Sequence, residues 1–433
     1  MIMGEIIRHT YSVCPVCLKR IPAVHKAYGK AVYLEKTCPE HGDFSAVIWR
    51  GRRDMEAWRG GLPPVAAGEN ENCPHGCGLC AEHRQGTCCV LLEVTKRCNL
   101  RCSFCFAEGG GGEDIPFDVI RKRLQALAVP GETLVQLSGG EPTVRGDLPQ
   151  IIAAAKEAGC QYVQLNTNGI RLGEDSQYVR DLAEAGLSFV FMQFDGTHDG
   201  IYRALRGREL LQIKKQAIDN CARHNLGVTL VPTIVPGINT QDIGNILRFA
   251  VSQSPVVRGV HFQPVSYFGR YPALPADERR FTLDELLAAI EEQAGTLVPW
   301  DSLLPSRCDH PLCGFHGSYI VMPDKTLSPL HRMDNSCRSK TTTAEQNRAF
   351  VALKWQRPQT GEAGNDDAVE SGFDSFNSFL QRIRSHSFTV TAMAFQDAGN
   401  LDLERLRRCS LHVFDDGRFV PFCAYYLTRH ASS

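Results

Sequence analysis

The chain has 433 residues, of which 43% are hydrophobic and 22% are charged, and its formal net charge is −1 at pH 7. This balance indicates a globular protein of two or three domains. The chain lacks the excess of basic residues that is typical of proteins that bind nucleic acid or an anionic membrane. No apolar run approaches the ~18–20 residues of a membrane span, and Met1–Arg8 lacks the layout of a signal peptide, so we expect a cytoplasmic protein.

Eighteen cysteines are the most unusual feature of the composition. In a chain of this size without an export signal, they favour metal binding over disulfides. Cys160 and Cys221 stand alone in helical-looking segments, and we expect both to be small core residues. The other sixteen fall into an N-terminal, a central and a C-terminal group, from which we predict three parts: residues 1–87, 88–275 and 276–433.

The N-terminal part begins with a knuckle-like pair, Cys14-Pro-Val-Cys17 and Cys38-Pro-Glu-His-Gly. Turns of this kind favour thiolate ligation, so Cys14, Cys17 and Cys38 predict a mononuclear iron or zinc site. Three thiolates need a fourth ligand, which His41, Cys73 or a later cysteine could supply.

A second motif, Cys73-Pro-His-Gly-Cys77-Gly-Leu-Cys80, has the spacing C-x3-C-x2-C. No strand precedes it, so we predict an auxiliary cluster here, completed by Cys88 or Cys89. A rival grouping is a rubredoxin-like centre formed by Cys14, Cys17, Cys77 and Cys80, and the spacing does not choose between the two.

The middle part alternates short apolar runs with helical segments, which predicts parallel strands joined by crossover helices. The expected strands are Val90–Thr95, Thr133–Ser138, Tyr162–Asn166, Phe189–Phe194, Gly227–Thr233 and Gly259–Pro264. The expected helices are Phe117–Leu127, Leu148–Ala158, Ser176–Ala185, Leu210–Asn225 and Asn239–Ser252. Six units suit an α/β fold with a partial (β/α)6 barrel, flanked by cysteine-rich metal-binding modules.

The central trio, Cys98, Cys102 and Cys105, directly follows the first of these strands. Three thiolates can hold three irons of a [4Fe–4S] cube and leave the fourth iron open, whereas electron-transfer clusters usually have four protein ligands. A zinc knuckle or a buried trio is the alternative interpretation.

Polar or glycine-rich segments follow the next three strands, at the edge where sites of such folds lie. Gly139-Gly140-Glu141-Pro142 comes first, and its glycines allow close approach of the backbone to a ligand. The polar side chains after it are Asn166, Asn168, Gln193 and Asp195. Turn formation is the alternative role of these polar residues.

The C-terminal part has one clear helix signal, in which Thr282 caps a helix that carries Asp284 and Glu285 and runs to about Gln293. Its five cysteines predict a second auxiliary cluster, with one thiol more than four ligands require. They are Cys308, Cys313, Cys337, Cys409 and Cys423.

The central trio with the Gly-Gly-Glu-Pro segment resembles the signature of the radical S-adenosylmethionine (SAM) enzymes. That resemblance implies a [4Fe–4S] cluster whose open iron binds SAM, and a low-potential donor such as ferredoxin or flavodoxin whose electron cleaves SAM to a 5′-deoxyadenosyl radical. It further implies SAM contacts from Gly139, Gly140 and Glu141 and an adenine-side position for Phe104. Asn166 and Asp195 would hold the ribose or the carboxylate of SAM.

The whole chain resembles the branch of archaeal tetraether synthases, once assigned as pterin methyltransferases. The resemblance rests on both N-terminal motifs, on Cys98-Asn-Leu-Arg-Cys102, and on the long terminal string from Cys409 to Cys423. It implies two auxiliary [4Fe–4S] clusters beside the barrel and an apolar channel for the substrate. The implied activity abstracts hydrogen from an unactivated carbon and forms a C–C bond on a lipid-like substrate. Such an enzyme would make peripheral contact with a membrane.

Three other functions compete with this one. The first is methylation of a reduced pterin or a similar small heterocycle, and the second is modification of a peptide by a maturase with auxiliary clusters. The third, from another class, is a non-catalytic scaffold rich in zinc.

Overall fold

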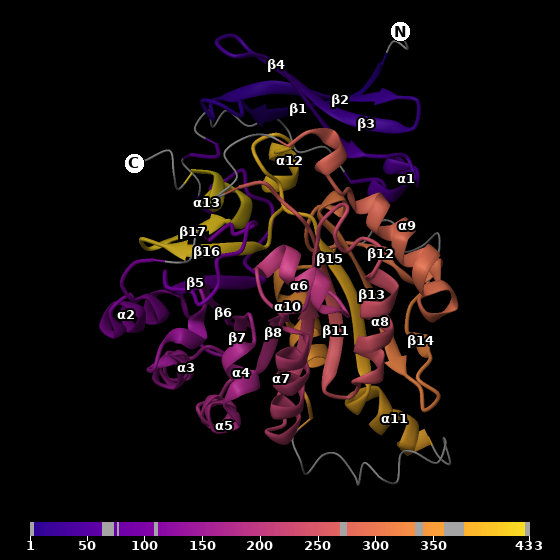
Figure 1. Ribbon diagram of the computed structural model, residues 1–433. Coiled ribbons are helices and arrows are strands. Elements are labelled where there is room, and N and C mark those ends of the chain that lie inside the picture. Colours follow the sequence, from indigo (N-terminus) through magenta and orange to yellow (C-terminus); the bar gives the residue numbers. More distant parts are fainter. Residues whose placement is uncertain are drawn as a thin grey trace.

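The computed structural model describes residues 4–62, 73–75, 78–107, 111–268, 275–333, 341–358 and 376–428, with side chains from 380 onward in the last range. Figure 1 shows three layers from top to bottom: an N-terminal sheet, a set of loops and short helices, and a large curved sheet covered by helices. Within these residues, no helix is both long and apolar enough to cross a membrane.

The N-terminal sheet is a four-stranded antiparallel meander in the order β1-β2-β3-β4. Its strands are β1 Glu5–Val13, β2 Arg20–Tyr28, β3 Ala31–Cys38 and β4 Gly42–Trp49, and the short helix α1 Met55–Arg59 follows. We expected a metal-binding module in this part of the chain but not a sheet.

The middle of the chain forms the expected barrel. Its parallel strands are β5 Cys89–Thr95, β6 Leu134–Gly139, β7 Tyr162–Thr167, β8 Phe189–Gln193, β9 Gly227–Val231 and β11 Val257–Pro264, and the two-residue β10 Thr233–Ile234 pairs with β11. The strands pair in the sequential order of a (β/α)6 unit. All six predicted strands are confirmed, with ends that differ by at most two residues.

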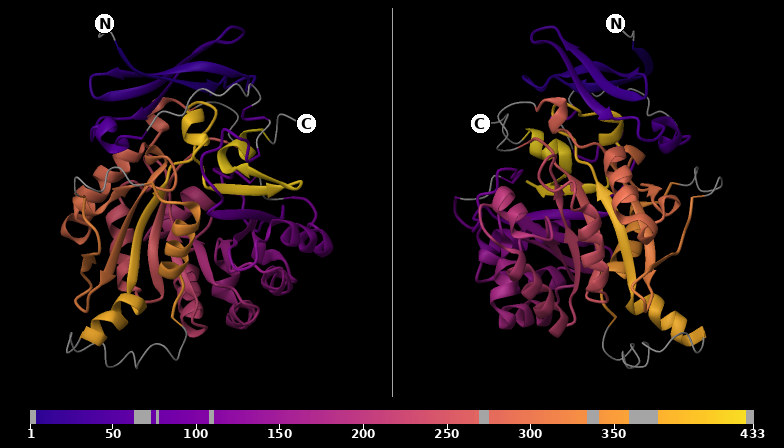
Figure 2. Two further views of the ribbon diagram at one scale, coloured as in Figure 1. Left: turned by 180° about the vertical axis from the view of Figure 1, so that it is seen from behind. Right: turned by 45° about the vertical axis from the view of Figure 1, so that its right-hand side comes forward.

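Helices cover the outer face of this sheet (Figures 1 and 2). They are α2 Phe117–Leu127, α3 Leu148–Glu157, α4 Ile170–Glu174, α5 Ser176–Glu184, α6 Asp199–Arg206, α7 Leu211–Arg223 and α8 Ile243–Ser252. Their apolar faces pack on the strands in one continuous core, and Cys160 and Cys221 belong to that core, as expected. The helices α4 and α6 were not expected, because each is shorter than three turns.

The C-terminal part extends the barrel sheet at both of its edges. Strand β15 (Ser387–Met393) pairs in parallel with β11, and β13 (Gly314–Val321) pairs antiparallel with β15. At the other edge, β16 (Leu411–Asp415) pairs in parallel with β5 and antiparallel with β17 (Arg418–Pro421). Each barrel edge is therefore covered by a strand from the last 130 residues, which protects it from pairing with other chains.

The remaining C-terminal elements include the predicted helix, α9 Leu283–Ala294, whose Thr282 and Glu285 form a capping box. The others are β12 Leu304–Pro305, β14 Leu327–Pro329, α10 Ala344–Trp355, α11 Phe376–Ser385, α12 Leu403–Leu406 and α13 Phe422–Thr428. The division of the chain at residues 87 and 275 stays a prediction.

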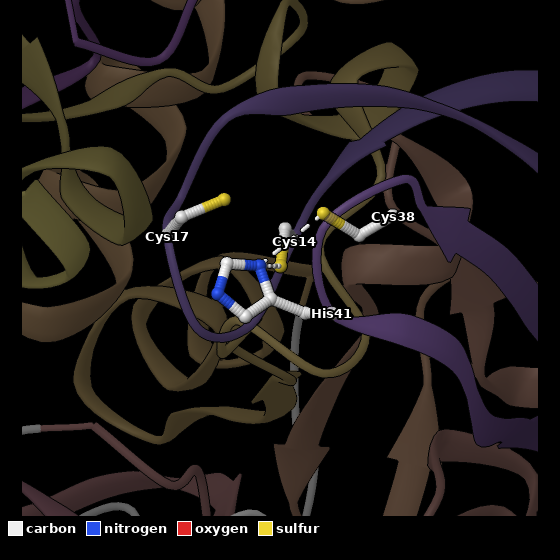
Figure 3. Close-up of side chains that lie close together, drawn as sticks. All are labelled: Cys14, Cys17, Cys38 and His41. Carbon is white, nitrogen blue, oxygen red and sulfur yellow. Dashed lines mark hydrogen bonds between the residues drawn. The ribbon is translucent and has the colours of Figure 1, made fainter.

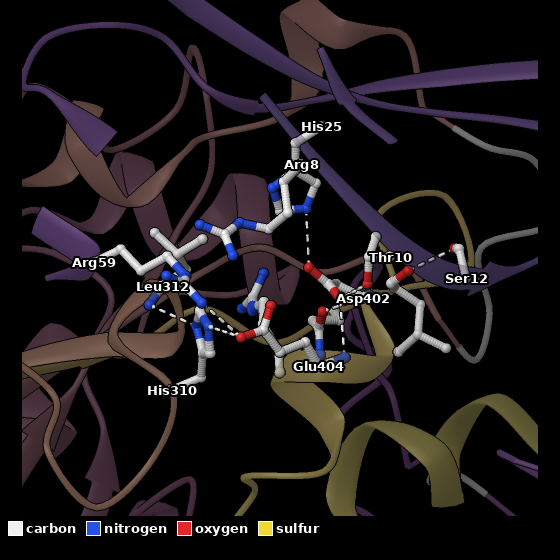
Figure 4. Close-up of polar contacts among 12 residues, drawn as sticks. Arg8, Thr10, Ser12, His25, Arg59, His310, Leu312, Asp402 and Glu404 are labelled. Atoms are coloured by element: carbon white, nitrogen blue, oxygen red, sulfur yellow. Dashed lines mark hydrogen bonds and ion pairs between the residues drawn. The ribbon is translucent and has the colours of Figure 1, made fainter. Parts of the chain in front are cut away.

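The N-terminal sheet lies over the carboxyl ends of the barrel strands and is held there by a buried polar cluster (Figure 4). Asp402 accepts hydrogen bonds from Thr10 (2.7 Å) and faces the imidazole of His25 at 2.9 Å. Burial alone would raise the pKa of Asp402, but the hydrogen bond and charge of His25 hold it well below its usual range. Lys36 donates to Ser12 and to the carbonyl of Ala398.

Candidate active site

The three central cysteines and the Gly-Gly-Glu segment line one cavity of about 210 Å³ at the carboxyl ends of the strands. Cys98, Cys102 and Cys105 are all partly exposed on the loop that follows β5. The three thiols thus face a common space beside the end of β6, which is the arrangement that a cluster with an open iron requires.

The two glycines allow the end of β6 to lie against this cysteine loop. The Gly140 N–H donates to the carbonyl of Thr95 and the Glu141 N–H to that of Arg97, both at 2.8 Å. A Cβ atom on Gly139 would meet the Thr95 oxygen at 2.3 Å, and one on Gly140 would meet the Arg97 oxygen at 2.1 Å. Neither position therefore tolerates a side chain without a shift of backbone.

The carboxylate of Glu141 is buried and hydrogen-bonded to other groups of the protein. It accepts hydrogen bonds from the hydroxyls of Thr143 (2.6 Å) and Thr167 (2.7 Å) and from the N–H of Asn168 (2.6 Å). These bonds join the end of β6 to the end of β7. Contact of Gly139, Gly140 and Glu141 with SAM stays a prediction, and the side chain of Glu141 is engaged in holding the two strand ends.

Asp195 lies behind the cavity wall, which differs from the direct contact that we expected. It is fully buried, does not line the cavity, and receives two hydrogen bonds from Arg206, at 2.8 and 2.9 Å. Arg206 does line the cavity, and its interaction partners include Cys102 as well as Asp195. Asp195 therefore positions a cation that faces the predicted cluster and SAM.

A second buried cation, Lys214, lies in the same region. It is fully buried on α7 and donates to the carbonyl of Asn168. Burial is the larger influence and lowers the pKa of Lys214 to about 8, although the charge of Asp195 opposes it. Neither Arg206 nor Lys214 was singled out in the sequence, because a basic residue on a helix is usually a solvated one.

The remaining predicted contacts do reach the cavity: Asn166, Gln193 and Phe104 all line it. Asn166 is held in place by the side-chain amide of Gln164, which donates to its Oδ1 at 2.7 Å. Their contact with SAM stays a prediction.

A larger cavity of about 700 Å³ continues from the first into the barrel and shares Asn166, Phe191 and Gln263 with it. Amide and imidazole groups line it from three strands of the barrel. They are Gln136 on β6, Gln164 and Asn166 on β7, and His261 and Gln263 on β11. On β7 and β11 these polar residues occupy alternate positions of otherwise apolar strands, and this alternation is visible in the sequence.

The hydrogen bonds of this polar lining are only partly satisfied within the described residues. Gln136 donates to the sulfur of Cys89 at 3.3 Å, and His261 pairs with the hydroxyl of Thr391 at 2.8 Å. The Oε1 atom of Gln164 is buried and meets no donor among these residues. Burial lowers the pKa of His261 to about 4, so the ring is neutral at pH 7.

The predicted N-terminal metal site is assembled, with His41 as its fourth member (Figure 3). The ligand atoms of Cys14, Cys17, Cys38 and His41 all lie within 4.8 Å of one another. His41 Nδ1 is 3.7 Å from the Cys14 sulfur and 3.4 Å from that of Cys38. Three thiols and one imidazole match a structural zinc site. Among the described residues, His41 rather than Cys80 completes this group, so the rival rubredoxin-like grouping is not supported.

The flanking cysteines meet one another across the chain. Cys88 contacts Cys308 from the C-terminal part. Cys409 lies within electrostatic reach of Cys313 and Cys423. Cys77 and Cys337 lie outside the described residues. The ligand sets of the two auxiliary clusters stay a prediction.

Comparison with known proteins shows to which family the chain belongs. The model of the radical SAM superfamily matches residues 92–250, and that of the "HMPTM N-terminal zinc ribbon domain" matches residues 6–50. The 7,8-dihydro-6-hydroxymethylpterin dimethyltransferase of Methanocaldococcus jannaschii is 33% identical over 471 residues, which covers 96% of this chain and 93% of that protein.

The chain belongs to the radical SAM family of this archaeal relative. The Fe-coproporphyrin III synthase of Methanosarcina barkeri is 30% identical over 238 residues, or 51% of this chain and 56% of that protein. Among solved structures, that of Streptococcus suis SuiB bound to the precursor peptide SuiA is 18% identical, with a TM-score of 0.40 over 48% of this chain and 46% of that one.

As a radical SAM enzyme, the chain uses a [4Fe–4S] cluster and SAM. The residues present fit that requirement, since the trio and the close-packed Gly139-Gly140 backbone face one cavity. The zinc ribbon named by the second match spans Cys14, Cys17, Cys38 and His41.

Proposed function

We propose that this radical SAM enzyme forms a carbon–carbon bond on a small polar heterocycle of the pterin kind by adding a methyl group. The observation that carries the proposal is the amide and imidazole lining of the inner cavity. Its volume of about 700 Å³ lies within the usual range for small-molecule sites.

Three groups in this lining are suited to the edge of a heterocycle. Gln164 has a buried oxygen with no donor among the described residues, and such an atom costs about 1–3 kcal/mol unless a ligand satisfies it. Gln136 on β6 and Gln263 on β11 add further amide groups to the lining. A hydrocarbon tail would leave the Gln164 oxygen unsatisfied, whereas a ring N–H of a heterocycle would pair with it.

The family relative supports the same class of substrate. The M. jannaschii protein is named as a dimethyltransferase of a reduced pterin, and it matches this chain over nearly its whole length. Aromatic rings stand beside the amides, with Phe191 and Trp355 at 4.7 Å between centroids, so a flat substrate can stack while its edge is hydrogen-bonded.

The protein's own part in the reaction is positioning and protection. When bound, the cluster and one SAM would supply the radical that abstracts hydrogen, and a second SAM would supply the methyl group and leave as S-adenosylhomocysteine, with the electrons coming from the low-potential carrier. Arg206, fixed by Asp195, presents a cation toward the carboxylate of SAM. His261 is neutral at pH 7 and, fixed by Thr391, offers its other ring nitrogen to the substrate as donor or acceptor. The enclosed cavity keeps water from the reactive carbon.

The test is an anaerobic incubation of the iron-reconstituted enzyme with a strong reductant, a reduced pterin, and SAM that carries a deuterated methyl group. We expect the label to appear on a carbon of the pterin. Gln164→Leu should lower this turnover at least about tenfold, because it removes the unpaired acceptor. Gln177→Leu, an exposed substitution on α5, is the matched control. Absence of label in every pterin product would contradict the proposal.

A lipid-like substrate is the second candidate, and the aromatic part of the same cavity favours it. Phe106, Phe350, Phe395 and Phe422 line the inner cavity together with Trp355. With such a substrate, two carbon chains would couple and no labelled methyl group would enter the product. Peripheral contact with a membrane belongs to this candidate.

We further propose two auxiliary clusters with ligand sets that follow the observed contacts. One set includes Cys88 and Cys308, and the other includes Cys313, Cys409 and Cys423. A low-potential carrier such as ferredoxin or flavodoxin would supply electrons. Iron analysis of Cys308→Ala and Cys409→Ala should show the loss of about four irons in each. Loss of no iron in either variant would remove this part of the proposal.

A further inference from the structure

An outer cavity of about 610 Å³ lies on the other side of the Leu304–Asp309 segment from the inner cavity. Its walls come from α1, from β12 and from the segment near Gln85. Five arginines line it: Arg53, Arg59, Arg84, Arg307 and Arg408. No function assigned above uses them.

Within the described residues, the acidic residues that line this cavity pair with only one of its five arginines. Asp54 caps the N-terminus of α1 through the Ala57 N–H at 2.7 Å. Asp309 accepts the N–H of Ser410 at 2.7 Å. Glu291 is the only lining carboxylate in an ion pair within the described residues, at 3.3 Å from Arg53.

Three of the guanidinium groups have unused donors. Arg84 and Arg307 make no side-chain hydrogen bond or ion pair with any residue that the structure describes. Arg59 is 6% exposed, and although it pairs with Glu404 at 2.7 Å, its Nε is buried without a partner among those residues. Guanidinium groups that share a concave site and have unused donors are a typical receptor for phosphate, since each can bind two oxygens at once.

The position of Arg307 connects this outer cavity to the substrate. Arg307, Ser306 and Thr342 line both cavities, so an anion held at Arg307 borders the inner cavity as well. Arg332 lines the inner cavity and pairs with Asp301 at 2.8 Å, while the amide groups lie toward the cluster. Unpaired positive charge therefore lies at the outer cavity and at Arg307, and neutral polar groups lie at the reacting end.

We infer that the arginine-lined outer cavity binds a phosphate or diphosphate group carried by the substrate, whose reacting end lies in the inner cavity. This inference rests on the proposed function only for the place of the reacting end. The shared chemistry is a phosphate ester, which either a soluble metabolite or a phospholipid headgroup can supply.

The experiment measures binding to the reconstituted full chain without reductant, so it does not depend on turnover. Inorganic pyrophosphate is titrated calorimetrically, and vesicles of phosphatidylglycerol are tested by co-sedimentation. We expect one of the two probes to bind, and its affinity to fall at least about tenfold in the Arg84→Gln/Arg307→Gln double variant. Arg307→Lys keeps the positive charge but cannot donate two parallel hydrogen bonds to a phosphate, so this variant should lose part of the affinity.

Arg121→Gln on α2 is the matched control, because Arg121 is exposed and paired with Asp118 on the surface. Pyrophosphate binding that depends on Arg84 and Arg307 assigns the group to a soluble substrate, and vesicle binding alone assigns it to a lipid; both support the inference. Binding of neither probe, or equal binding by the double variant and wild type, would overturn it. Failure of the proposed function would instead appear as unlabelled product from wild-type enzyme.

Discussion

Asp195 and Arg206 form a buried two-point ion pair, with N–O distances of 2.8 and 2.9 Å, at the wall of the cysteine-lined cavity. Asp195 is fully enclosed, and its Oδ1 also accepts the N–H of Thr233 at 3.1 Å. Asp195 therefore holds the Arg206 guanidinium on the side away from the cavity. The side of the guanidinium that lines the cavity can face an anion. The carboxylate of SAM is the anion that this site would meet.

Asp195→Asn should weaken SAM binding by about tenfold or more, because the amide cannot hold Arg206 in the same two-point geometry. Equilibrium dialysis of SAM against the reconstituted enzyme measures this effect. Asp181→Asn, an exposed change on α5, serves as the control. Unaltered SAM affinity in Asp195→Asn would show that Arg206 has no part in cofactor binding.

Gly140→Ala should prevent correct assembly of the cluster site, since its Cβ would lie 2.1 Å from the carbonyl oxygen of Arg97. The cysteine loop must move to accept it, and we expect both iron content and 5′-deoxyadenosine formation to fall. Gly146→Ala is a close control, because no atom lies within 4 Å of a Cβ at that position. Equal activity of the two variants would rule out the tight backbone contact.

Asp402→Asn should destabilise the docking of the zinc ribbon on the barrel (Figure 4). The carboxylate pairs with His25 at 2.9 Å and both side chains are buried, so removal of one partner costs about 3–5 kcal/mol. Chemical denaturation followed by tryptophan fluorescence measures the loss. Glu40→Gln breaks a surface pair with Lys19 and should leave the midpoint unchanged. A wild-type midpoint for Asp402→Asn would contradict the role of this pair.

The stability of the fold should decline as the pH falls from about 6.5 toward 4. Burial lowers the pKa of His261 and of His316 to about 4, whereas an unfolded histidine titrates near 6.5. Between these values only the unfolded state binds the protons, so acidification favours unfolding. Melting temperatures across this range, with metal content checked at each pH, should show a smaller decline in His261→Gln. The exposed His198→Gln should behave as wild type.

The barrel could be predicted because its signal is local. Short apolar runs such as Phe189–Gln193 alternate with amphipathic helices, and each crossover brings the next strand alongside the last. The C-terminal strands could not be predicted in the same way. Strand β15 joins β11 across more than 120 residues, and its partner β13 contains two glycines, so neither has a turn or crossover that marks it.

The residues of the candidate site also differ in how well the sequence predicts them, and local features are again the predictable ones. The Cys98 loop and Gly139-Gly140 were predicted because their function lies in the backbone and in fixed spacing. The ligand sets of the flanking cysteines depend on which distant segments meet, and Cys88 meets Cys308 only because the C-terminal strands enclose the barrel. Asp195 could be predicted only in part. The sequence shows a polar residue at a strand end, but it does not show that Arg206 from α6 donates hydrogen bonds to its carboxylate.

The most direct test of the central claim is quantitation of 5′-deoxyadenosine in anaerobic incubations of wild type and Cys102→Ala with SAM and a strong reductant. Cys102, Cys98 and Cys105 together hold the cluster that cleaves SAM in this account, so wild type should form the product and the variant should form none. Iron at the auxiliary sites should persist in the variant. Equal formation of 5′-deoxyadenosine by both proteins would contradict the assignment of the trio.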